Sequence, residues 1–166
     1  MRVLGIDPGF ATVGFGVLDY DGYKFKPVEY GAVLTEPGVA FEKRLNAIAV
    51  DTKFIINRFK PDCMSIEKLF FTTNLKTGID VAQARGVLLL SAAQADLPVY
   101  EYTPLQVKQG VVGYGKAQKI QVMEMVRVIL KLSELPKPDD AADALAIAIC
   151  HCHNTLTQQR TAALKS

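Results

Sequence analysis

The chain has 166 residues, of which 49% are hydrophobic and 22% are charged, and its formal net charge is +2. This length and composition fit one folded domain and exclude a disordered chain, and the small net charge requires any nucleic-acid surface to come from local clusters of cations. No apolar run reaches the roughly 20 residues that a membrane span needs, and no secretory signal is visible at the N-terminus, so we expect no membrane partner.

A carboxylate follows the first predicted strand. Residues 3–6 are expected to form a short buried strand, and Asp7 comes directly after it, before the turn dipeptide Pro8-Gly9. Because an unpaired buried carboxylate is costly, Asp7 must be paired, cap the turn or bind a cation. For such an aspartate taken alone, a turn or capping role is the commoner one.

Two glycines occupy one face of the second predicted strand. Apolar residues alternate with Gly14 and Gly16 over residues 11–19, which is a strand pattern. Glycines at these positions allow another backbone or a ligand to approach closely. The Asp21-Gly22 turn then leads to a third, antiparallel strand over residues 23–35.

The rest of the chain alternates helices with strands. Apolar spacing predicts strands over 63–70 and 97–102, and helices over 41–59, 75–95, 103–109, 116–132 and 139–153. Strand periodicity places Cys63, Ser65 and Glu67 on one face. This order predicts a mixed sheet with helices on its faces, in a single α/β domain over residues 1–154. The polar tail, residues 155–166, is expected to be frayed and flexible.

Four carboxylates can converge in this arrangement. The strands that carry Asp7 and Glu67 can be neighbours under the right-handed crossover rule. Asp140 and Asp143 share a face in the first turn of the last helix, with Asp139 as the expected N-cap. The alternative is that the two aspartates only stabilise the N-terminus of the helix, where the helix dipole favours negative charge.

Converging carboxylates repel one another and are tolerated mainly around hard divalent cations. Oxygen ligands suit Mg²⁺, for which Mn²⁺ can substitute. Two such ions roughly 4 Å apart can activate a water and stabilise the leaving oxygen of a phosphodiester. We therefore expect one or two ions in this cluster.

Basic side chains gather near the fourth predicted helix. Phosphate contacts require such cations. The candidates on the predicted helix are Lys116, Lys119, Arg127 and Lys131, and Lys108 lies just before the glycine-rich segment 110–115. A solvated helix face is the alternative for Arg127 and Lys131.

Two further patterns do not carry chemistry. The segment 110–117 nearly matches a phosphate-binding P-loop, but Ala117 lacks the required hydroxyl and a helix precedes the segment instead of a strand. The His151-Cys152-His153 segment has no second ligand pair for zinc, so helix-end packing is preferred. Cys150 and Cys152 are too close in sequence for an ordinary disulfide, which leaves free thiols in a reducing cytoplasm.

Five segments, in this order, resemble motifs of the RuvC family of bacterial Holliday-junction resolvases. They are residues 4–9 (LGIDPG), 66–70 (IEKLF), 83–86 (QARG), 106–109 (QVKQ) and 140–148 (DAADALAIA). The resemblance covers nearly the whole chain and implies a ribonuclease H-like mixed five-stranded sheet flanked by helices. It also implies a homodimer that makes paired, symmetric, Mg²⁺-dependent nicks in four-way DNA junctions during recombination and repair, leaving 5′-phosphates. A branch-migration helicase complex is the partner that it implies.

The same resemblance assigns roles to particular residues. The catalytic, metal-binding acids fall on Asp7, Glu67, Asp140 and Asp143. Lys108 and Lys119 fall near the scissile phosphate, where Lys119 would stabilise developing charge. Lys116 is a third expected DNA contact, but it comes from the basic cluster described above and not from the resemblance. An aromatic that stacks on an unpaired base falls on Phe70, although packing within its loop is the alternative for that residue.

Some alternatives stay open. Phe71 and Thr72-Thr73 depart from the commoner family residues, which leaves base preference open. An actin-like ATPase or sugar kinase shares the opening Gly-Ile-Asp-x-Gly strand but needs a duplicated domain. A catalytically silent junction-binding module and a less selective nuclease of the same fold are two further possibilities. The apolar residues 87–90 are expected in the dimer interface or in the core.

Overall fold

A five-stranded sheet organises the fold. The computed structural model describes residues 1–69 and 75–163, with the side chains of 1–69 and 77–155. The strands are β1 (Arg2–Asp7), β2 (Thr12–Tyr20), β3 (Phe25–Leu34), β4 (Cys63–Glu67) and β5 (Val99–Tyr102). Their spatial order is β3-β2-β1-β4-β5, in which β1, β2 and β3 are antiparallel and β4 and β5 join in parallel. The predicted mixed sheet is confirmed.

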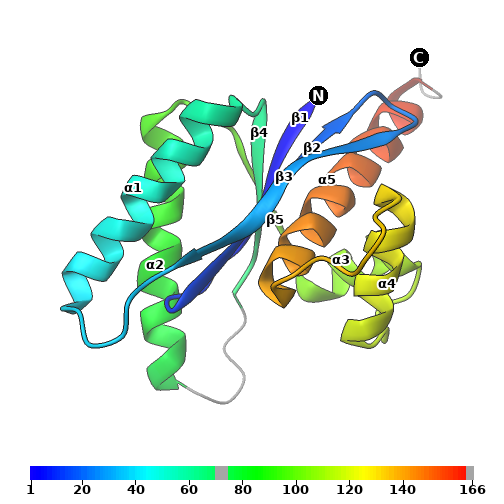
Figure 1. Ribbon diagram of the computed structural model, residues 1–166. Helices are drawn as coiled ribbons and strands as arrows, with labels where there is room; N and C mark the ends of the chain where they lie inside the picture. The colour runs from blue at the N-terminus through cyan, green and yellow to red at the C-terminus, as the bar shows by residue number, and fades with distance from the viewer. Residues whose placement is uncertain (70–74, 164–166) are drawn as a thin grey trace.

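Helices cover both faces of this sheet. They are α1 (Phe41–Phe59), α2 (Leu75–Gln94), α3 (Pro104–Val112), α4 (Lys119–Leu130) and α5 (Asp139–Ala163). Figure 1 shows α1 and α2 together on one face, and α5 with α3 and α4 on the other. Among the described residues, no helix combines the length and hydrophobicity that a membrane crossing needs.

The alternation of side chains along each strand divides the core into two clusters. Leu4 and Ile6 of β1 and Met64 of β4 point to one face, where they pack with Ile48 of α1 and Leu88 of α2. All five side chains are almost completely buried. This cluster fixes α1 and α2 against the sheet.

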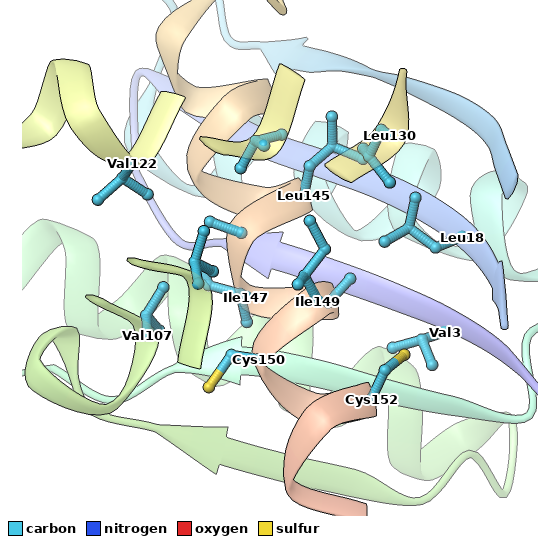
Figure 2. Packing of buried hydrophobic residues seen from close by; sticks show 14 of the residues in the cluster. Val3, Leu18, Val107, Val122, Leu130, Leu145, Ile147, Ile149, Cys150 and Cys152 are labelled. Atoms are coloured by element: carbon cyan, nitrogen blue, oxygen red, sulfur yellow. The ribbon is translucent and has the colours of Figure 1, made fainter. Parts of the chain in front are cut away.

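The second cluster surrounds α5. Val3 and Leu18 from the sheet pack against α5, and Val107 of α3 and Val122 of α4 close the cluster from outside, as Figure 2 shows. The α5 side chains in it are fully buried. Helix α5 is therefore a central element held from two sides, and packing over residues 141–152 sets its position.

Glycines let α5 lie unusually close to the sheet. A Cβ atom built on Gly14 would overlap the carbonyl oxygen of Asp140, and one built on Gly5 would overlap that of Ala144. Gly16 also faces α5 and has no room for a Cβ atom. Of the two explanations that the sequence allowed, close approach of another backbone is thus the correct one for β2.

Several helix ends differ from the predictions. Helix α3 continues to Val112 because Gly113, with φ of 92°, terminates it in the left-handed conformation. Helix α4 begins not at Lys116 but at Lys119, where the side chain of Gln121 accepts from the backbone N–H of Gln118 and caps the first turn. The last helix was predicted to end at His153, but α5 continues to Ala163.

Candidate active site

Strand pairing brings the first two acids together. Strands β1 and β4 are parallel neighbours, with Ile6 opposite Ile66, so Asp7 and Glu67 follow at the same edge of the sheet. Both point to the α5 face, since Leu4 and Ile6 point to the opposite one. The prediction that these two strands are neighbours is confirmed.

Helix α5 contributes a third acid to the same place. Asp143 lies in a cavity of about 260 Å³ that Asp7 and Glu67 also line, together with Lys108 and Lys119. The apolar part of the wall consists of Pro104, Val107 and Val122. Three of the four predicted acids and two of the predicted lysines therefore share one cavity.

Local capping aims α3 at this cavity. The hydroxyl of Thr103 accepts from the backbone N–H of Gln106, and the Gln106 side chain accepts from the backbone N–H of Thr103. With Pro104 in the first turn, this capping box fixes the start of the helix. Val107 and Lys108 then reach the cavity from the next turn. Val107 and Val122 were not predicted as wall residues, although their apolar helical spacing marks them as buried.

Lys119 forms an ion pair with the acids of α5. Its Nζ lies 2.9 Å from a carboxylate oxygen of Asp143 and 3.6 Å from one of Asp139. Partial burial lowers the pKa of Lys119, but the hydrogen bond to Asp143 and the nearby carboxylates outweigh it, so the pKa is raised. The expected N-cap role of Asp139 is wrong, because the carbonyl of Pro138 accepts the first helical bonds and Asp139 is already helical.

The acids of the cavity resist ionisation. Burial, followed by the charges of Asp143, Glu67 and Asp140, raises the pKa of Asp7 to about 8, against an opposing effect of Lys119. Burial and the charge of Asp143 raise the pKa of Glu67 to about 7. Burial also raises the pKa of Asp143, although its hydrogen bond to Lys119 opposes this. At neutral pH the cavity is therefore short of positive charge.

The donor chemistry fits a hard cation. All the acidic donors are carboxylate oxygens, which Mg²⁺, Ca²⁺ and Mn²⁺ prefer. Among the described residues, however, no three acidic, histidine or cysteine side chains already lie close enough together to hold one ion. Asp143 is paired with Lys119 instead. A third carboxylate would have to turn toward Asp7 and Glu67 when a cation binds.

Some predicted site residues lie elsewhere. Asp140 is not among the residues that line the cavity; its backbone packs on Gly14, and it acts on Asp7 through its charge. Lys116 is exposed in the segment before α4 and does not line the cavity. Its predicted position on the fourth helix is wrong, because that helix starts three residues later. Phe70 lies outside the described residues.

The remaining cations of the predicted basic face are spread out. Arg127 pairs with Glu124 one turn earlier in α4, at 2.9 Å. Lys131 follows α4 in the left-handed conformation, with φ of 54°. Of the cations expected on this helix, Lys119 and Arg127 lie within it, whereas Lys116 and Lys131 lie just outside its ends.

The chain is similar to proteins of one family along nearly its whole length. A family model described as crossover junction endodeoxyribonuclease RuvC matches residues 3–151. A protein of that name from Caldanaerobacter subterraneus is 52% identical, over 96% of this chain and 97% of the relative. One from Finegoldia magna is 57% identical, over 91% of this chain and 92% of the relative.

Solved structures show the same similarity. Thermus thermophilus RuvC in complex with a Holliday junction substrate is 38% identical, with a TM-score of 0.91 over 95% of this chain and 96% of that one. The yeast mitochondrial Holliday junction resolvase Ydc2 is 14% identical, with a TM-score of 0.67 over 99% of this chain and 85% of that one. The second likeness shows a shared fold alone.

Proposed function

This chain belongs to the RuvC family of crossover junction endodeoxyribonucleases, and on that basis we propose that it resolves four-way DNA junctions by paired, symmetric nicks. The activity serves homologous recombination and DNA repair. Identity above 50% over more than nine-tenths of the chain supports this function and displaces the ATPase alternative. The observation that carries the assignment of the site is the cavity that Asp7, Glu67 and Asp143 line together with Lys119.

The proposed ligands for the cation are Asp7, Glu67, Asp140 and Asp143. Their oxygen donors and the raised pKa values of Asp7 and Glu67 support a divalent ion. Magnesium is our candidate, with manganese as a substitute and one or two ions per subunit. When bound, such an ion supplies an activated water and stabilises the leaving oxygen of the phosphodiester.

Lysines supply the remaining positive charge. Lys119 holds the carboxylate of Asp143, and its ammonium is available to stabilise charge that develops on the phosphate. Lys108 lines the same cavity and lowers the pKa of Glu67 through its charge, so it is suited to a neighbouring phosphate. Phe70 remains a proposed DNA contact on the family resemblance alone, and Lys116 remains one on its place in the predicted basic cluster. Cleavage of the P–O3′ bond leaves a 5′-phosphate and a 3′-hydroxyl.

A homodimer gives two active sites for the paired cuts. Helix α2 carries an exposed stripe at helical spacing, formed by Ile79, Gln83, Gly86 and Leu90. Its two large apolar members, Ile79 and Leu90, are 55% and 56% exposed. Of the predicted interface residues 87–90, Leu88 is fully buried in the monomer core and cannot take part, whereas Leu90 remains a candidate. We also propose a branch-migration helicase complex as partner and a cytoplasmic location, and membership of the family supports both.

The test compares a four-way junction with a linear duplex of the same sequence, in Mg²⁺. We expect paired nicks in the junction only. Asp7→Asn should abolish cutting and leave junction binding intact, whereas Asp51→Asn, at an exposed position of α1, should cut like the wild type. Equal cutting of the duplex would favour a less selective nuclease, and binding without any cutting would favour a silent module. Cutting by Asp7→Asn would refute the assigned site.

A further inference from the structure

Arg44 packs against the turn that follows Asp7. The guanidinium carbon of Arg44 lies 4.0 Å from the ring centroid of Phe10, and the Phe10 ring stacks on that of Phe41 at 4.6 Å. Arg44 also donates from Nε and Nη2 to the hydroxyl oxygen of Thr35, at 3.0 and 2.8 Å. The guanidinium is therefore held in one orientation by a stack and a fork of two hydrogen bonds.

The hydroxyl of Thr35, which accepts from this guanidinium, is uncharged, and its hydrogen-bonding capacity is fully used. The Thr35 hydroxyl donates to the carbonyl oxygen of Phe10 at 2.7 Å, so its proton is used, and the two bonds from Arg44 use its lone pairs. Within residues 1–69 and 77–155, no carboxylate pairs with Arg44, whereas Arg2 pairs with Asp19. In the same part of the chain, Nη1 of Arg44 makes no hydrogen bond. The positive charge is left for a ligand.

The topology puts this arginine at the edge of the sheet that carries the acids. Strands β1 and β3 both run antiparallel to β2, so Asp7 and the end of β3 lie at one edge. Thr35 follows β3 directly, and Arg44 lies in the first turn of α1. Strand β3 is two strand spacings from β1, roughly 10 Å. Arg44 thus lies at the end of the sheet that carries the acids, on the β3 side, in the helix that covers the face opposite to the one where Lys108 and the acids line the cavity.

We propose that Arg44 binds a backbone phosphate of the DNA strand that crosses this edge, a short distance along the strand from the cleaved phosphate. A planar guanidinium recognises phosphate oxygens with two parallel N–H bonds. Because Phe10 and Thr35 already fix the side chain, little rotamer entropy is lost when the phosphate binds. This inference rests on the proposed nuclease function and adds a contact to it.

The experiment measures junction binding over a series of salt concentrations, in chelator so that no cutting occurs. The logarithm of the binding constant falls with the logarithm of salt, with a slope of about 0.9 for each phosphate contact. We expect Arg44→Met to reduce this slope by about 0.9 for every subunit that contacts the DNA. Arg44→Lys keeps the charge and should keep most of the slope. Arg58→Met is the matched control, since Arg58 lies near Phe54 and Phe59 at the opposite end of α1.

The alternative is that Arg44 only stiffens the turn after Asp7. In that case Arg44→Met would lower the melting temperature and the cutting rate but keep the wild-type salt slope, and the proposal would be overturned. An equal loss of slope in Arg58→Met would overturn it as well. Failure of the wild type to bind the junction at all would refute the proposed function instead, so the two failures are distinguishable.

Discussion

Replacing Gly14 by alanine tests whether close contact between β2 and α5 sets the position of the acids. The added methyl would overlap the carbonyl oxygen of Asp140 and lie 3.0 Å from its Cβ atom. The obstacle is backbone, and α5 is packed against the sheet and α3 over residues 141–152, so moving either side costs packing energy. Overpacking of this kind costs about 1–3 kcal/mol, and removing a glycine from the unfolded chain returns less than about 1 kcal/mol.

The net destabilisation expected for Gly14→Ala is therefore about 2 kcal/mol, which lowers the melting temperature by about 4–8 °C in a chain of this size. Thermal unfolding by circular dichroism measures it. Gly31→Ala is the matched control in the adjoining strand, where the new methyl meets only the ring of Phe15, at 3.2 Å. That ring is half-buried and can turn aside, so the control should melt within about 2 °C of the wild type.

Gly14→Ala should also lose junction cutting under conditions where it is still folded, because the first turn of α5 must shift away from the sheet with Asp140 and Asp143. Cutting is measured well below the melting temperature of the variant, with circular dichroism as the check on folding. Equal melting temperatures for the two alanine variants would refute the close-contact explanation. A clear loss of stability with wild-type cutting would refute the claim that this contact positions the acids.

Three further outcomes follow from the same structure. In chelator, Asp7→Asn should raise the free energy of unfolding at pH 7–8 by about 1–3 kcal/mol, and the stabilities of the variant and the wild type should become equal near pH 4. The pKa of Asp7 is about 8 in the folded state against 3.8 in the unfolded chain, so the native state binds more protons between these values. The stability of the wild type therefore falls as the pH rises through this range. Urea unfolding at several pH values measures this, and equal stability of the two proteins at pH 8 would contradict it. Leu88→Ala should cost about 2–5 kcal/mol because Leu88 is fully buried, whereas Val50→Ala at a 55% exposed position should cost less than about 1 kcal/mol, both measured by urea unfolding. Leu90→Arg should convert the proposed dimer to a monomer in analytical ultracentrifugation, and an unchanged sedimentation coefficient would exclude the α2 stripe as the interface.

Local periodicity was enough to predict the strand part of the site. Side chains alternate along any strand, and the right-handed crossover rule allows the strands of Asp7 and Glu67 to be neighbours, which the structure confirms. The pairing of Asp140 with Asp143 on a helix was equally local, because residues three apart share a helical face. These rules depend only on positions along the chain.

What covers each face depended on packing between distant segments. The residue types show that Gly14 and Gly16 leave space on one face of β2, but the α5 backbone fills that space only in the folded chain. The same packing turns Asp143 into the cavity and toward Lys119, and leaves Asp140 with its backbone against Gly14. The physical reason is that a carboxylate's role depends on distance and burial, and both are set by contacts between elements far apart in the chain.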